Sequence, residues 1–136
     1  MIVCGIEMSA SEARLVVLKG TRANYSFVDL KPRKLVLADD ESQDAVKAFQ
    51  DTVFAFLREN LIDKVVIKKR MKRGEFSGGP VGFKMEGIVQ LYPGCQISLL
   101  SAPTVAAVMR RNSLMSPKGM VKYQQAAFET AYSGLS

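Results

Sequence analysis

The order of its apolar segments constrains the fold of this chain more than any other feature of the sequence. Three segments near the amino terminus alternate in the manner of strands and are separated by short turns. Helical and strand-like segments then take turns to the end of the chain. This order predicts an antiparallel meander that parallel strands extend through helical crossovers. The predicted strands are Ile2–Glu7, Ala13–Lys19, Asn24–Leu30, Lys64–Ile67 and Gln96–Leu100.

Four helices complete the predicted order, and three of them begin with recognisable signals. Ser42 is the expected N-cap of the longest helix, Pro80 opens the second, and Ser101 caps the third. Met120–Tyr132 is expected to close the chain as the fourth helix. Right-handed crossovers then place the strands in the order 3-2-1-4-5 with helices on both faces, so we predict one α/β domain over residues 1–136.

The composition excludes several classes of protein. The chain contains no histidine, which excludes a Ser-His-Asp triad, a Cys-His pair and histidine metal ligands. Cys4 and Cys95 are expected to lie too far apart to form a disulfide. Two unpaired cysteines and the lack of a secretory signal at the amino terminus predict a cytoplasmic protein. No apolar run reaches the length of a membrane span, so no membrane partner is expected.

A basic segment follows the fourth predicted strand and leads into a glycine-rich loop. Of the 19 Lys and Arg residues that give the chain its net charge of +6, several are gathered here. The next helix begins at Pro80, and a helix amino terminus offers unpaired backbone N–H groups to an anion. In α/β sheets, ligands collect at the carboxyl ends of the strands. The expected phosphate-binding residues are Lys68, Lys69, Arg70, Lys72, Arg73, Gly78, Gly79 and Lys84.

Two interpretations of this basic segment stay open. A run of charges is often only a solvated loop that keeps a protein soluble. Lys84, however, lies in the first turns of a helix, where a cation opposes the helix dipole unless an anion is nearby. The segment GGPVGFK lacks the Ser or Thr that follows the lysine in a Walker-type loop. Hydrolysis of a nucleotide at this loop is therefore not expected.

Three sequence segments, CGIE, VVIKKR and GGPVGFKMEGIVQL, resemble a small bacterial family of unknown function within the RNase H-like superfamily. The order of elements is similar to that of the RuvC- and YqgF-type Holliday-junction resolvases. This resemblance implies an RNase H-like five-stranded mixed sheet and places Glu7 at the position of the resolvases' first catalytic carboxylate. The second acid of the resolvases corresponds to Lys68 or Lys69, and the last to Tyr123 or Gln125.

These departures make a binding protein the preferred interpretation. A lysine in place of an acid repels Mg²⁺ and attracts phosphate, so we predict a pseudoenzyme that binds nucleic acid or another polyanion and needs no cofactor. One alternative is a resolvase-type nuclease that uses Mg²⁺ or Mn²⁺ at a rearranged site of Glu7, Glu86 and Glu129, with Glu7 as a metal ligand. Another is a non-enzymatic homodimer in which Gly82, Glu86 and Gln90 line a contact between helices.

Overall fold

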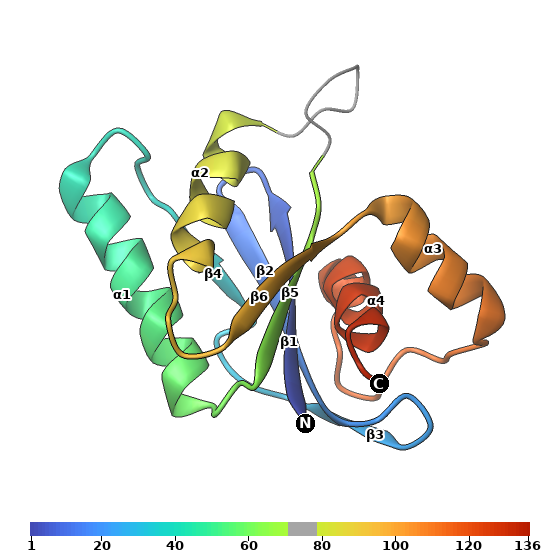
Figure 1. Ribbon diagram of the computed structural model, residues 1–136. Helices are drawn as coiled ribbons and strands as arrows, with labels where there is room; N and C mark the ends of the chain where they lie inside the picture. The colour runs from blue at the N-terminus through green and yellow to red at the C-terminus, as the bar shows by residue number, and fades with distance from the viewer. Residues whose placement is uncertain (71–78) are drawn as a thin grey trace.

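The computed structural model describes residues 1–70 and 79–136, which form one mixed sheet with helices on both faces (Figure 1). Within this described part, no helix combines the length and the apolar character needed to cross a membrane. The elements in chain order are β1 (Ile2–Ser9), β2 (Glu12–Gly20), β3 (Tyr25–Val28), β4 (Lys34–Val36), α1 (Gln43–Glu59), β5 (Lys64–Lys68), α2 (Pro80–Gln90), β6 (Gln96–Leu100), α3 (Ala102–Arg111), the 3₁₀ helix η1 (Lys122–Gln124) and α4 (Gln125–Ser133).

The sheet has β1 at its centre. β1 pairs antiparallel with β2 and parallel with β5, and the main path of the sheet runs β3-β2-β1-β5-β6. This confirms the predicted order of the five strands. The structure adds a sixth strand, β4, which pairs antiparallel with the first part of β2. The sequence did not predict β4 as a strand of the sheet, because its three residues are too few to establish an alternating pattern.

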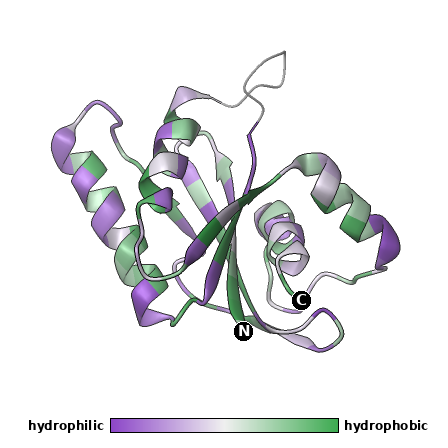
Figure 2. Cartoon of the chain, viewed as in Figure 1, coloured by the Kyte–Doolittle hydropathy of each residue, from purple (hydrophilic) through white to green (hydrophobic). Residues whose placement is uncertain are grey.

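Each face of the sheet buries its own apolar layer. The side chains of Cys4, Ile6 and Met8 on β1 pack in the layer beneath α1 and α2. Val3 faces the other way, into the layer beneath α3 and α4. Figure 1 shows these two helix pairs on opposite sides of the sheet. Figure 2 shows hydrophobic strands at the centre, whereas α1 alternates between hydrophobic and hydrophilic turns because one side of this helix faces solvent.

The helix signals in the sequence mark the observed helix starts. The Ser42 side chain accepts a hydrogen bond from the Ala45 N–H, Ser101 caps α3 in the same way, and Pro80 is the first residue of α2. The last helix differs from its predicted range. It begins with the short 3₁₀ turn η1 and continues as α4, because the Gln124 side chain accepts from the Val121 N–H and tightens the entry to the helix.

Two local features of β1 set the geometry of its carboxyl end. The turn after β1 contains only Ala10 and Ser11, with Ala10 at a φ of 50°, so Ser9 pairs with Glu12 and the register of the hairpin is fixed. Gly5 lets α4 approach closely, because a Cβ at this position would lie 2.5 Å from the backbone N of Ala131. α4 therefore lies directly against the face of β1 that also carries Glu7.

Candidate functional site

Four charged side chains lie in one row across the sheet, at the carboxyl ends of β1 and β5. Arg14 on β2 is paired with Glu7 on β1, and Lys34 on β4 is paired with Arg14. The parallel register of β1 with β5 pairs Ile6 with Ile67, so the next residues along the two strands, Glu7 and Lys68, follow side by side. Residues that are directly opposite each other on neighbouring strands point to the same face of a sheet. Lys34, Arg14, Glu7 and Lys68 therefore share the α4 face, and we call them the charged row.

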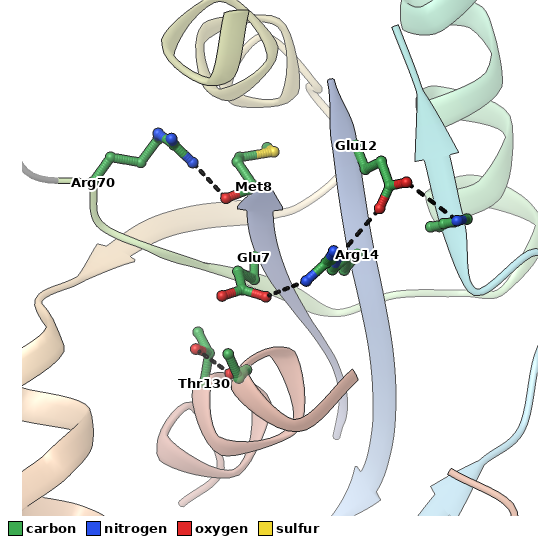
Figure 3. A network of polar contacts seen from close by, with 8 residues as sticks. Glu7, Met8, Glu12, Arg14, Arg70 and Thr130 are labelled. Atoms are coloured by element: carbon green, nitrogen blue, oxygen red, sulfur yellow. Dashed lines mark hydrogen bonds and ion pairs between the residues drawn. The ribbon is translucent and has the colours of Figure 1, made fainter. Parts of the chain in front are cut away.

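The outer part of the charged row is a continuous series of ion pairs that links Glu7, Arg14, Glu12 and Lys34 (Figure 3). Arg14 Nη1 lies 3.6 Å from Glu7 Oε1, and Arg14 Nε donates to Glu12 Oε2 at 3.2 Å. Lys34 Nζ donates to Glu12 Oε1 at 3.1 Å. The hydrogen bond from Lys34, followed by that from Arg14, holds the pKa of the Glu12 carboxyl below its usual value. Both cations also lie over the Tyr123 ring, at 5.5 Å for Arg14 and 5.3 Å for Lys34.

The inner end of the row is different, because no described side chain neutralises Lys68 or its neighbour Lys69. Lys68 is partly buried on the α4 face, and Lys69 is exposed. The backbone N–H of Lys69 donates to the Leu100 carbonyl at 2.7 Å, which fixes the end of β5 against β6. Among the residues that the structure describes, neither lysine side chain has a hydrogen-bond or ion-pair partner. These two cations are therefore available to an external anion.

Arg70, a predicted phosphate-binding residue, is used inside the chain. Its Nη1 donates to the Met8 carbonyl at the end of β1, and its guanidinium lies 5.8 Å from the centre of the Phe83 ring. The same group packs against Gly82, where an added Cβ would lie 2.6 Å from Arg70 Cζ. Arg70 therefore joins the ends of β5 and β1 to α2.

The other predicted phosphate-binding residues lie away from the charged row or outside the described residues. Lys84 Nζ donates to the Asp40 carbonyl at 2.6 Å and lies 3.8 Å from Asp40 Oδ2, so the loop before α1 neutralises its charge. Gly79 is the exposed N-cap of α2, without a neighbouring atom that would exclude a side chain. Three further predicted residues fall outside the described part of the chain: Lys72, Arg73 and Gly78.

The structure does not gather the three predicted catalytic acids. Glu86 is buried on α2, whereas Glu7 lies on the α4 face of the sheet. Glu129 on α4 accepts a hydrogen bond from the Gln125 side chain at 3.0 Å. In the two described ranges, no three His, Cys, Asp or Glu side chains are placed to hold a metal ion together.

The surroundings of Glu7 do not fit a divalent cation. The Arg14 guanidinium already lies 3.6 Å from the Glu7 carboxylate, and Lys68 is next to it in the row. Both charges repel Mg²⁺ or Mn²⁺. The Tyr123 ring lies beneath Arg14, at a position where the resemblance to the resolvases implied an acid. We therefore derive no metal-dependent step from this site.

The residues predicted to line a dimer are largely covered by the chain itself. Gly82 and Glu86 are both buried, and Arg70 packs on Gly82. Of the three residues, Gln90 alone is exposed. This face of α2 is therefore occupied by contacts within one chain.

The partners of Glu7 were not predicted from the sequence. A signal for Arg14 was present, because a two-residue turn after Ser9 places Glu7 and Arg14 opposite each other. No comparable signal existed for Lys34, whose strand is too short to show a pattern. The bridging role of Glu12 depends on both of these residues and could not be read without them.

The fold is similar to that of Holliday-junction resolvases. Thermus thermophilus RuvC is 13% identical, with a TM-score of 0.74 over 98% of this chain and 92% of RuvC. T. thermophilus RuvC in complex with a Holliday junction substrate is 15% identical, with a TM-score of 0.68 over 98% and 91% of the two chains. The yeast mitochondrial Holliday junction resolvase Ydc2 is 12% identical, with a TM-score of 0.54 over 96% of this chain and 74% of Ydc2. At these identities the likeness shows the fold, and it confirms the predicted RNase H-like architecture.

The sequence also matches a described family. No curated protein sequence matches the chain significantly. A family profile described as "Protein of unknown function (DUF3010)" matches residues 1–134, nearly the whole chain. The predicted membership in a family of unknown function is thereby confirmed, and the chain belongs to the DUF3010 family.

Proposed function

We propose that this protein binds nucleic acid at the carboxyl ends of β1 and β5, without two-metal hydrolysis. The observation that carries the proposal is a pair of lysines at the end of β5, Lys68 and Lys69, which no described side chain neutralises. Support comes also from the fold, since RuvC, with the same architecture, has been captured in complex with a Holliday junction substrate. Lysines at a strand end bind phosphate groups as point charges, which gives affinity without base specificity.

Glu7 does not oppose this role. Its carboxylate is paired with Arg14, so its negative charge is balanced on the side away from Lys68. The electrostatic potential at the Lys68 end of the row is therefore positive, and the exposed Lys69 adds to it. A sugar-phosphate backbone laid along this edge would therefore meet an attractive field, which is the main source of affinity in sequence-independent binding.

The test measures the affinity for a fluorescently labelled four-way DNA junction and for a duplex of equal length. Fluorescence anisotropy reports the binding, at salt concentrations between about 50 and 200 mM. We expect the affinity to fall as salt rises. The double variant Lys68→Glu/Lys69→Glu should lose most of the binding. Its neutral counterpart, Lys68→Gln/Lys69→Gln, should flatten the plot of log affinity against log salt by about one unit for each phosphate contact removed.

A matched control separates binding at this edge from the effect of net charge on DNA affinity. Lys19→Glu/Lys47→Glu changes the net charge by the same amount, but Lys19 lies at the opposite end of the β1–β2 pair and Lys47 is on the exposed side of α1. This control should retain most of the affinity. An equal loss in both double variants, or no binding by the native protein at low salt, would overturn the proposal. Binding to heparin but not to DNA would replace nucleic acid by another polyanion.

A further inference from the structure

Three side chains from three different elements meet at the outer end of the charged row. Arg14 on β2 and Lys34 on β4 both lie over one aromatic ring, that of Tyr123 on η1, at 5.5 and 5.3 Å from its centre. The attraction between a cation and the face of a ring holds both charges near one place. Arg14 and Lys34 are also directly opposite each other on paired strands, so the backbone too keeps the two side chains close. Two cations are therefore held side by side before any ligand arrives.

Glu12 occupies the space between these two cations. Its Oε2 accepts from Arg14 and its Oε1 from Lys34, at 3.2 and 3.1 Å, so each carboxylate oxygen serves a different cation. A phosphodiester group likewise presents two charged oxygens on one atom, and guanidinium and ammonium groups bind both kinds of anion. The Glu12 side chain thus makes the contacts that a backbone phosphate would make at this place.

The exchange of Glu12 for a phosphate would cost little. The side chains of Lys34, Arg14 and Glu12 are 43%, 27% and 25% exposed, so the network is open to solvent. Ion pairs with this degree of exposure contribute little to stability, because water solvates the separated charges well. A phosphate on a bound strand could therefore displace the carboxylate without unfolding the edge of the sheet.

We propose that Arg14, Lys34 and Tyr123 form a second phosphate subsite, and that Glu12 fills this subsite in the free protein and competes with the ligand. This inference rests on the proposed function and adds a length requirement to it. Within the row, Lys34 is three strand spacings from Lys68, about 14 Å, and Arg14 is two, about 10 Å. One phosphate cannot reach both ends of the row, so the ligand is an oligonucleotide or a longer nucleic acid rather than a mononucleotide.

The test is the variant Glu12→Gln, which keeps the shape of the side chain and removes its charge. With the competitor gone, we expect affinity for the labelled junction to rise about three- to tenfold at moderate salt, with a steeper salt dependence by about one to two units. Phosphate ion and a mononucleotide can occupy only one end of the row, so they should remain far weaker ligands than the junction in every variant. The control is Glu59→Gln, which makes the same charge change at an exposed position on α1. Folding of both variants is checked by urea unfolding.

Further variants test whether the gain in DNA affinity of Glu12→Gln comes from the subsite. Glu12→Asp keeps the charge and should not gain affinity, and Glu12→Gln/Arg14→Gln/Lys34→Gln should lose the gain. If Glu12→Gln binds no better than Glu59→Gln while binding still depends on Lys68 and Lys69, the inference is wrong and the proposed function stands. If Glu12→Gln gains affinity although Lys68→Glu/Lys69→Glu has no effect, the subsite is supported and the proposed role of the β5 lysines is wrong.

Discussion

Lys68 and Arg70 stand two residues apart in the same basic segment, yet the structure uses them on two different sides of the sheet. Lys68 is the last residue of β5 and faces α4, where no described side chain neutralises it. Arg70 follows the strand and reaches the α2 side, where it donates to the Met8 carbonyl and lies beside Phe83. Lys84 on α2 is likewise tied to Asp40. On the α2 side, Arg70 and Lys84 hold elements together, whereas on the α4 side Lys68 has no partner among the described residues.

A run of charges is therefore not a single functional unit. The role of each cation is set by which acceptors lie within reach of its side chain, and those acceptors come from distant parts of the chain. Met8 and Asp40 are far from Arg70 and Lys84 in sequence, so no local pattern reveals these pairs. Substitutions on each side, with matched controls, test whether the two sides differ in this way.

The largest effect is expected on the α4 side, from Gly5→Ala. The new Cβ would lie 2.5 Å from the backbone N of Ala131 and 2.6 Å from its Cβ, so α4 would have to move. Since backbone cannot rotate away as a side chain can, the cost should be at the upper end for overpacked cores, about 3 kcal/mol. Urea unfolding measures it.

The matched control for this change is Gly87→Ala. An added Cβ on Gly87 meets no atom within 4 Å, and the residue is exposed within α2. Alanine favours a helix over glycine by about 1 kcal/mol, so this variant should be as stable as the native protein or slightly more stable. Equal destabilisation by both substitutions would show that the close approach of α4 to β1 is not what requires glycine at position 5.

The sequence was sufficient for the main path of the sheet but not for its edge. Short turns, helical crossovers and their right-handed sense leave few arrangements of five strands, so the order could be predicted. β4 has too few residues to show a period. Its absence from the prediction also removed Lys34 and the bridge through Glu12, since both depend on the pairing of β4 with β2.

The position of the candidate site could be predicted from the sequence, but not which of its cations are free to bind a ligand. The resemblance to resolvases placed Glu7 at the end of β1, and the run after β5 placed cations near it; the parallel register brings Glu7 and Lys68 together. Whether a given cation is free or engaged depends on tertiary contacts. For that reason Arg70 and Lys84 were assigned to phosphate by pattern alone, although each has an acceptor within the chain.

Smaller effects are expected from Arg70→Met and Lys68→Met. The first should lower stability and the second should weaken DNA binding. Both substitutions remove one charge and keep a long side chain. Arg70→Met loses a hydrogen bond from a charged donor, so the free energy of unfolding should fall by about 2 kcal/mol, with little change in DNA affinity of the folded fraction. Lys68→Met should change stability by less than about 0.5 kcal/mol and lower the salt slope of DNA binding by about one unit. Losses of the same kind in both variants would remove the distinction between the two sides.

The smallest effect is expected from Lys84→Met, which tests whether the α2 side has any part in binding. The Lys84 side chain is 44% exposed, and its partner carboxylate on Asp40 is 36% exposed, so solvent weakens their ion pair. We expect a loss of less than about 1 kcal/mol in urea unfolding and no change in DNA affinity or salt slope. Asp40→Asn should reproduce the small loss of stability, because it weakens the same contact from the other side. If Lys84→Met instead lowers DNA affinity as much as Lys68→Met does, then phosphate competes with Asp40 for this lysine, and the binding edge extends across the sheet to α2.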